Sequence, residues 1–146
     1  MQVVLQRVQD ASVSVDGEQV GAIGLGLVAL VGVGRESCEA DATWLAAKTE
    51  QVRVFADEDG RMNRSCEEVG GAVLAISQFT LYGDARKGRR PSFVAAADPA
   101  EGERLYEAYC DALTVPCARG VFGAHMQIRL TADGPVTLTL SHACNA

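Results

Sequence analysis

The segment that decides the fold is Ser77–Phe93, which reads Ser-Gln-Phe-Thr-Leu-Tyr-Gly-Asp-Ala-Arg-Lys-Gly-Arg-Arg-Pro-Ser-Phe. The apolar run Ala72–Ile76 precedes it and follows Gly70-Gly71, which predicts a buried strand that begins after a turn. The strand ends in side chains that can hydrogen-bond, and a loop with four cations comes next. Such a segment can hold a polyanion beside fixed polar groups. It is equally consistent with a core strand followed by a solvated charged loop.

The cations of this loop stand out against an acidic chain. The net charge is −6, which argues against the broadly basic face used for general nucleic-acid binding. Four positive side chains nevertheless fall within five positions. They are Arg86, Lys87, Arg89 and Arg90. The pattern predicts a local contact with an anionic partner.

The composition is that of one ordinary globular domain, which we assign to residues 1–146. Apolar residues make up 48% and charged residues 22% of the chain. No window approaches the ~20 apolar residues of a membrane span, and we find no signal sequence. We therefore expect a cytoplasmic protein with no membrane partner. The five scattered cysteines lack a Cys-x-x-Cys pair, which favours unpaired thiols over disulfides or a zinc site.

Hydrophobic periodicity predicts mainly strands. The predicted strands are Val3–Val8, Ala11–Val15, Glu18–Ile23, Leu27–Val33, Val52–Phe55 and Ala72–Ile76, followed by alternating runs at 126–130 and 136–140. Asp16-Gly17 predicts a hairpin turn, and Asp57–Gly60 predicts another turn. Thr131–Pro135 separates the last two runs, and the tail Ser141–Ala146 is expected to fray.

Two helices complete an α+β domain. Ser37 is the predicted cap of a helix over Cys38–Gln51, and Trp44 lies off its apolar stripe, at an edge or an interface. Asp98 followed by Pro99 predicts the start of the second helix. Its apolar positions are predicted to be core. They are Leu105, Tyr106, Tyr109 and Leu113.

Three other motifs fail on inspection. Gly24-x-Gly26 is followed by a strand, so the helix end that binds a dinucleotide phosphate is missing. Asp57-x-Asp59 resembles a calcium loop, but Arg61 stands where a ligand belongs. Neither histidine belongs to a nucleophile-elbow motif. We therefore predict no metal and no cofactor.

Several short motifs together resemble the D-aminoacyl-tRNA deacylases, the D-tyrosyl-tRNA deacylase family, over nearly the whole chain. They are Gln6-Arg7-Val8, Ser77-Gln78-Phe79-Thr80-Leu81, Arg90-Pro91-Ser92-Phe93 and Asp133-Gly134-Pro135-Val136-Thr137. The resemblance implies that family's fold, a mainly antiparallel, barrel-like sheet with two helices. It also implies a homodimer that proofreads translation by hydrolysing the ester of D-aminoacyl-tRNA, which releases the D-amino acid and tRNA.

The resemblance further implies how such an enzyme senses handedness. The Gly134-cisPro135 carbonyls of one subunit enter the pocket of the other and accept hydrogen bonds from the substrate's α-ammonium. They occupy the space that an L side chain needs, so L-aminoacyl groups are rejected whatever their side chain. Glycine has no side chain, so glycyl-tRNA mischarged on tRNA-Ala is an expected second substrate.

Roles for the other matching residues follow from the same resemblance. Ser77, Gln78, Phe79 and Thr80 are expected to line the site of carbonyl attack. Thr80 is either a nucleophile or a positioning group, and we favour positioning because no neighbouring base in the sequence would activate it. Arg7 would brace the Gly-Pro segment, and Phe122 and Met126 would lie beside the pocket. The four loop cations would contact acceptor-stem phosphates.

One departure and two alternatives remain. Many relatives carry Asn before Asp-Gly-Pro, whereas this chain has Ala132, so a side-chain hydrogen bond from that position is absent. The chain could instead be a non-catalytic RNA-binding module that uses the basic loop. It could also be a small serine or threonine esterase that acts on free substrates.

Overall fold

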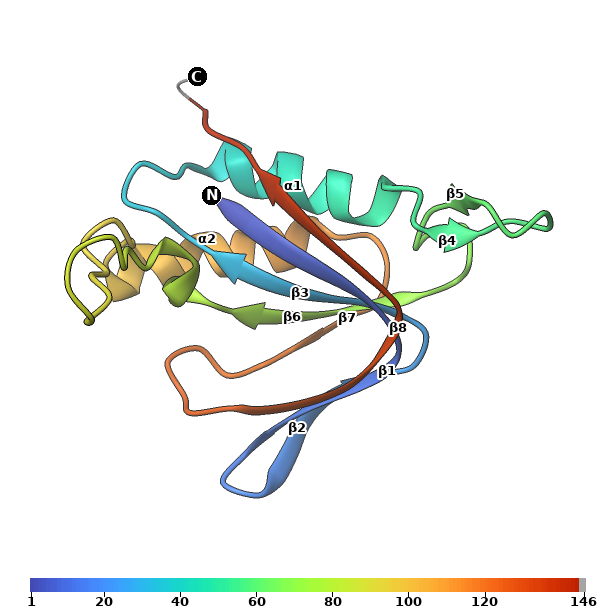
Figure 1. Ribbon diagram of the computed structural model, residues 1–146, viewed down its shortest axis with the longest axis horizontal. Helices are drawn as coiled ribbons and strands as arrows, with labels where there is room; N and C mark the ends of the chain where they lie inside the picture. Colours follow the sequence, from blue (N-terminus) through green and yellow to red (C-terminus); the bar gives the residue numbers. More distant parts are fainter. Residues whose placement is uncertain (145–146) are drawn as a thin grey trace.

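A computed structural model describes residues 1–144, and within them a curled sheet is covered on one face by two helices (Figure 1). The strands of the main sheet follow the order β2-β1-β3-β6-β7, and β8 pairs with the other edge of β1. Their bounds are β1 Gln2–Val15, β2 Glu18–Ile23, β3 Gly26–Gly32, β6 Ala72–Ser77, β7 Cys117–Arg119 and β8 Gln127–Ser141. The predicted barrel-like, mainly antiparallel sheet is confirmed, with β3–β6 and β6–β7 as parallel pairs.

The first and last strands are each longer than predicted. The two strands predicted over residues 3–15 are one strand, β1, and the two runs at 126–130 and 136–140 are one strand, β8. They pair from Gln2↔Ser141 to Ser14↔Gln127, with irregular register near Val8. Such irregularities bend a strand without ending it. As a result, β1 pairs with β3 along its first half and with β2 along its second half.

The two helices are α1, Glu39–Gln51, and α2, Pro99–Ala112. The predicted cap of α1 is wrong: Cys38 is the cap residue, and its N–H donates to the Asp41 carboxylate at 2.9 Å. The Ser37 hydroxyl instead accepts from the Gly34 N–H at 2.9 Å. The predicted start of α2 is confirmed, because Asp98 accepts from the Glu101 N–H at 3.1 Å with proline next in the chain.

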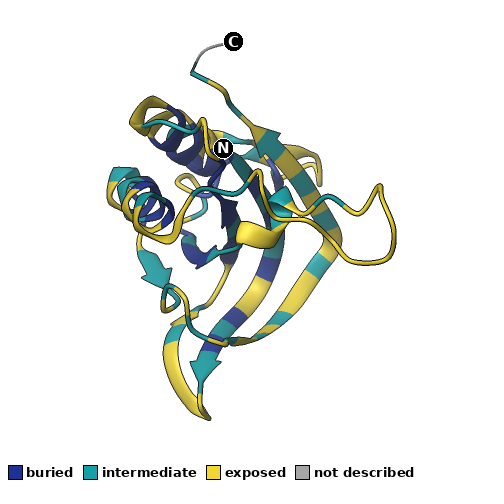
Figure 2. Cartoon of the chain, turned by 90° about the vertical axis from the view of Figure 1, so that its left-hand side faces the viewer, coloured by how far each residue is buried: buried dark blue, intermediate teal, exposed yellow. Residues whose placement is uncertain are grey.

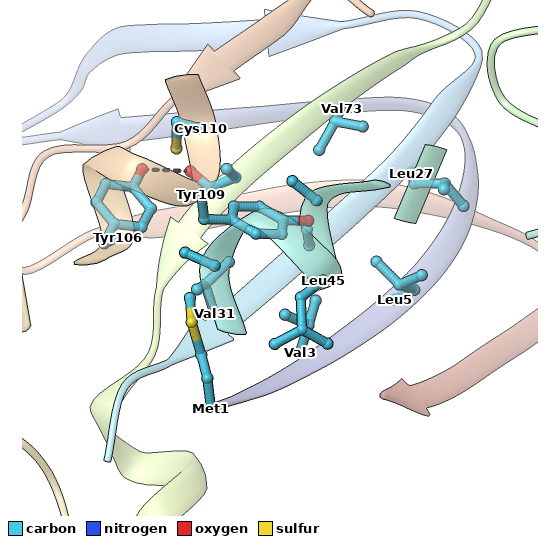
Figure 3. Close-up of a cluster of buried hydrophobic side chains, with 14 of the residues drawn as sticks. Met1, Val3, Leu5, Leu27, Val31, Leu45, Val73, Tyr106, Tyr109 and Cys110 are labelled. Carbon is cyan, nitrogen blue, oxygen red and sulfur yellow. Dashed lines mark hydrogen bonds between the residues drawn. The ribbon is translucent and has the colours of Figure 1, made fainter. Parts of the chain in front are cut away.

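The main core lies between the helices and the sheet (Figures 2 and 3). Both predicted core tyrosines are buried and satisfied. The Tyr106 hydroxyl donates to the Ala75 carbonyl at 2.8 Å, and the Tyr109 and Thr49 hydroxyls are 2.8 Å apart. The first bond fixes α2 against β6, which ends at Ser77, and the second joins α2 to α1.

The remaining elements differ from the sequence prediction in detail. Val52 ends α1, and the short strand β4 is Phe55–Ala56 instead of Val52–Phe55. β4 pairs across the predicted turn with β5, Met62–Arg64, which the sequence analysis missed along with β7. Neither helix in the described part of the chain has the length and apolar character to cross a bilayer.

The tail is held in place as far as residue 144, contrary to the prediction that it frays. The His142 N–H donates to the Met1 carbonyl at 3.1 Å, and its ring Nδ1 lies 2.7 Å from Asp41. Trp44 stacks on the same ring with 4.6 Å between centroids, which places it at an edge as predicted. Residues 145–146 of the predicted frayed tail lie outside the described residues.

A buried carboxylate joins the two helices. Glu50 in α1 is 6% exposed, and its oxygens accept hydrogen bonds from the segment that follows α2. The donors are the Thr114 N–H at 2.9 Å, the Thr114 hydroxyl at 3.0 Å and the Val115 N–H at 3.2 Å. These hydrogen bonds fix the loop between α2 and β7, since the N–H and hydroxyl groups of this loop would otherwise have no hydrogen-bond partner.

Glu50→Ala is expected to lower the free energy of unfolding by about 2–4 kcal/mol, because it leaves several donors unpaired at a buried position. Urea denaturation measures the loss. Glu67→Ala, at an exposed neighbouring position, is the matched control and should change stability by about 0.5 kcal/mol or less. Equal stabilities of the two variants would contradict this role for Glu50.

Candidate active site

The Ser-Gln-Phe-Thr motif lies at the surface, where the strand β6 ends. Ser77 is its last residue, and the Gln78 N–H donates to the Val31 carbonyl at 2.7 Å. The chain then forms a short 3₁₀ turn, η1, Phe79–Tyr82, before the basic loop begins. The sequence pattern predicted that the loop follows the strand directly, so this turn is a difference from the prediction. The turn matters because it points successive side chains outward in a fixed order.

A cleft of about 580 Å³ opens at this point. Five of the residues proposed from the sequence line it together: Ser77, Gln78, Phe79, Phe122 and Met126. The other walls come from Val33, Ile76, Phe93, Ala96, Ala97, Asp98, Pro99, Gly102, Gly123, Ala124, His125 and Ile128. The cleft therefore lies between the end of β6, the start of α2 and the segment before β8.

Two aromatic rings form one side of the cleft. Phe79 and Phe93 meet edge to face, with ring centroids 5.1 Å apart and an interplanar angle of 71°. They are 56% and 37% exposed, which is unusual for phenylalanine. Phe93 belongs to a motif that the sequence analysis quoted, but no site role was predicted for it. Exposed rings at a cleft offer a flat surface on which another ring can stack.

Thr80 lies beside the cleft, next to Gln78. The Gln78 amide nitrogen donates to the Thr80 hydroxyl oxygen. Within the described residues, the Gln78 amide is the side-chain hydrogen-bond partner of the Thr80 hydroxyl. No histidine or carboxylate there forms a hydrogen bond with the Thr80 hydroxyl. A hydroxyl nucleophile needs a base to accept its proton. The geometry therefore favours a positioning role for Thr80.

Arg7 holds the segment that contains Gly134 and Pro135. Its Nε donates to the Asp133 carbonyl at 3.2 Å, and its Nη1 donates to the Val54 carbonyl at 2.6 Å. The Gly134–Pro135 bond is cis, in agreement with the expectation from the family. Both residues are exposed and are absent from the lining of their own chain's cleft. The structure thus brings Arg7 to this segment but not to the cleft.

The basic loop ends near the cleft, because Phe93, three residues after Arg90, lines the cleft. The Arg86 side chain forms two hydrogen bonds to the Asp84 carboxylate, at 2.9 Å and 2.7 Å, and its backbone N–H donates a third at 3.0 Å; together they lower the pKa of Asp84. Much of the Arg86 charge is therefore matched within the loop. Lys87, Arg89 and Arg90 are exposed and form no ion pair within the described residues. These three cations are the ones available to an outside anion.

Comparisons with known proteins agree with this arrangement. The model of the family described as D-Tyr-tRNA(Tyr) deacylase matches residues 4–141. A D-aminoacyl-tRNA deacylase of Thermus aquaticus is 57% identical over 143 residues, covering 96% of this chain and 94% of that protein. A D-aminoacyl-tRNA deacylase of Thermomicrobium roseum is 53% identical over 146 residues, covering 98% and 95%.

Two solved structures share the fold. One is described as the c-Myc DNA Unwinding Element Binding Protein; it has a TM-score of 0.92 and 36% identity, and the match covers 99% of this chain and all of that one. The other is described as a probable eukaryotic D-amino acid tRNA deacylase, with a TM-score of 0.79 and 18% identity over 97% and 98% of the two chains. At that identity the second likeness supports the fold alone.

The curled sheet, its two helices and the cleft at the end of β6 define a small α+β protein with a cleft at the Ser-Gln-Phe-Thr segment. The full-length family match and the identities above 50% make the assignment specific. The chain belongs to the D-Tyr-tRNA(Tyr) deacylase family, whose members are hydrolases of aminoacyl-tRNA esters.

Proposed function

We propose that the chain hydrolyses the ester bond of D-aminoacyl-tRNA and that the cleft is its active site. The single observation that carries this proposal is the cleft itself, because Ser77, Gln78 and Phe79 of the family motif form its wall. Its volume of about 580 Å³ lies within the usual range for small-molecule sites. Two relatives that are named for this activity match the chain over nearly their full length.

The cleft suits the terminal nucleoside of an aminoacylated tRNA. Exposed aromatic rings commonly stack on unpaired bases, and Phe79 with Phe93 offers such a surface at the edge of the cleft. The basic loop next to Phe93 can contact phosphates farther along the acceptor stem through Lys87, Arg89 and Arg90. The base and the phosphates would then enter from the same side.

The start of the 3₁₀ turn can stabilise the reaction. The first N–H groups of a helical turn lack an acceptor within the turn, and here they belong to Phe79 and Thr80. In this proposal they hold the oxyanion that forms when water attacks the ester carbonyl, which is typically worth ~3–4 kcal/mol per donor. Gln78 and Thr80 position the reacting groups, and the substrate's ribose 2′-hydroxyl helps to direct the water.

Handedness would be sensed across a homodimer. Gly134 and Pro135 are exposed and braced by Arg7, yet they do not line the cleft of their own chain. In a second copy the same carbonyls can enter this cleft, accept hydrogen bonds from the α-ammonium and fill the space of an L side chain. A D side chain would point outward, where no contact with the protein would distinguish one type of side chain from another. Glycine would pass, which makes glycyl-tRNA mischarged on tRNA-Ala a second substrate.

The direct test compares the loss of ester from D-Tyr-tRNA and L-Tyr-tRNA with the same enzyme preparation. We expect release of D-tyrosine and no acceleration with the L ester, because an L side chain collides with the inserted carbonyls. Binding of both tRNAs without ester loss would indicate the RNA-binding module instead. Hydrolysis of a simple chromogenic ester at a comparable rate would indicate a general esterase.

Thr80→Ala is expected to lower kcat by about 10- to 100-fold, the effect of one lost positioning hydrogen bond. Removal of a covalent nucleophile typically costs ~10⁶-fold. Thr80→Ser keeps a hydroxyl and serves as the control, with activity near that of the parent chain. A covalent adduct on Thr80 in rapid-quench mass spectrometry would overturn the positioning role.

Replacement of Lys87, Arg89 and Arg90 by Gln is expected to weaken tRNA binding and to reduce the slope of log K against log salt by about two to three, because each lost phosphate contact releases about one fewer counterion. Filter binding at several salt concentrations measures the slope. The control replaces Arg53, Arg61 and Arg64 around the β4–β5 turn, at the opposite end of the molecule (Figure 1). An unchanged slope in the loop variant would remove this role.

A further inference from the structure

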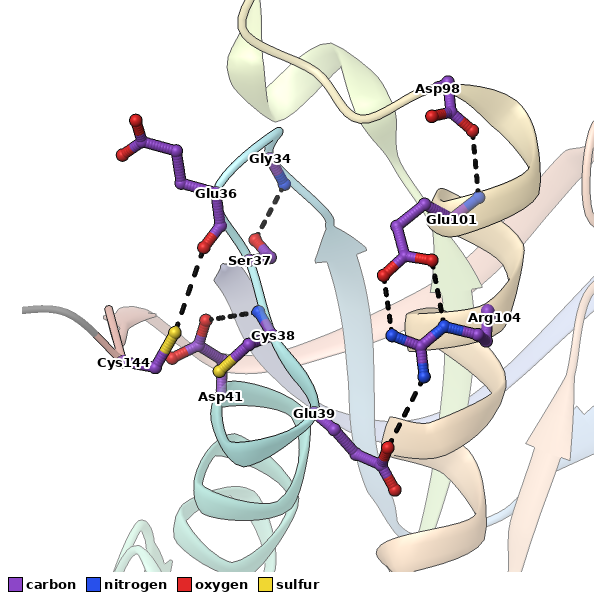
Figure 4. Close-up of polar contacts among 10 residues, drawn as sticks. All are labelled: Gly34, Glu36, Ser37, Cys38, Glu39, Asp41, Asp98, Glu101, Arg104 and Cys144. Carbon is purple, nitrogen blue, oxygen red and sulfur yellow. Dashed lines mark hydrogen bonds and ion pairs between the residues drawn. The ribbon is translucent and has the colours of Figure 1, made fainter.

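Two thiols and a carboxylate meet at the start of α1, away from the cleft (Figure 4). Cys38 is the cap residue of the helix, Asp41 lies in its first turn, and Cys144 comes from the tail after β8. One potential ligand atom from each lies within 4.8 Å of the others. The sequence analysis found no metal-ligand spacing, because Cys144 is 106 residues from Cys38 and only the fold brings them together.

The carboxylate is held in a fixed orientation. Asp41 is 0% exposed; one oxygen accepts from the Cys38 N–H at 2.9 Å and the other lies 2.7 Å from Nδ1 of His142. Each carboxylate oxygen has a second lone pair that these bonds leave free. A histidine hydrogen-bonded to a ligating carboxylate is a common outer partner at metal sites, since it fixes the direction of the ligand.

The two thiols are close to each other and half-buried. Cys38 and Cys144 are unpaired cysteines with partly exposed side chains, and their sulfur atoms lie within 4.8 Å of each other. The Cys144 sulfur also lies 3.9 Å from the Glu36 carbonyl, which holds the tail against the segment before α1. A cation bound here would offset the negative charge of the Asp41 carboxylate and of the two thiolates that ligate it.

We propose that Cys38, Asp41 and Cys144 bind one thiophilic divalent cation of the zinc class, with a water in the fourth position. Two thiolates and a carboxylate suit zinc, whereas calcium and magnesium prefer oxygen ligands alone. On binding, the two S–H bonds break, two sulfur–metal bonds form, and two protons leave to solvent.

The site would act as a structural clamp. None of the three ligands lines the cleft, so the proposal is independent of the hydrolytic activity. A metal shared by Cys38 and Cys144 would join the end of β8 to the first turn of α1. Because only the folded chain brings the three ligands together, the cation binds the folded state in preference to the unfolded state and should stabilise it.

The experiment titrates cobalt chloride and then zinc chloride into the metal-free full chain, reduced with a phosphine. We expect a thiolate-to-cobalt charge-transfer band that saturates at one equivalent, disappears when zinc displaces cobalt, and is matched by a zinc-dependent rise in Tm. Cys38→Ser and Cys144→Ser should each weaken zinc binding about 100-fold or more, because loss of an outer partner alone typically costs 10–100-fold.

Two features make the variants interpretable. Serine is a good cap residue, so Cys38→Ser removes the thiol without removing a cap, and its D-aminoacyl-tRNA hydrolysis should match the parent chain. Cys117→Ser is the matched control, because Cys117 and Cys110 form a second hydrogen-bonded thiol pair elsewhere. Cobalt binding that survives Cys144→Ser, or that is lost in Cys117→Ser instead, would overturn the assignment.

Discussion

The pairing of β1 with β8 along almost their entire length is the interaction on which the rest of the structure depends. It gives β1 a partner on one edge throughout, while β3 and β2 share its other edge and curl the sheet. The same ladder places the Gly134–Pro135 segment beside Arg7. It also carries the tail past the start of α1, where Cys144 reaches Cys38. Three separate surfaces are thus positioned by one pair of strands.

The sequence predicted the elements whose signals are local. Ala72–Ile76 is a buried strand, Asp16-Gly17 is a hairpin turn, and Asp98 with Pro99 begins α2, as expected. Ser37 failed as a cap because its hydroxyl accepts from the Gly34 N–H, while the N–H of the actual cap residue, Cys38, donates to Asp41. Gly134-Pro135 suggested a break between two strands, since proline lacks the N–H of a ladder. The long partner strand β1 carries the chain across that irregularity.

For the site, the motif at Ser77–Phe79 predicted one wall of the cleft, and Phe122 and Met126 predicted part of another. The sequence could not assign Phe93, Asp98 or His125 to that cleft, because they reach it only through the packing of α2 and its flanking loops. Arg86 looked equivalent to its basic neighbours, yet Asp84 holds it. The sequence shows which residues are charged and how they are spaced. Which charges pair with each other is decided by the folded structure.

The pairing of Gln2 with Ser141 joins residues that are far apart in the sequence, and the order in which they are synthesised affects folding on the ribosome. Since translation proceeds from the N-terminus, β1 is made before β8 and must wait for all the intervening elements before this partner emerges. Until then one edge of β1 has exposed amide and carbonyl groups, which favour pairing with other nascent chains. The native sheet can therefore close only after β8 has been synthesised.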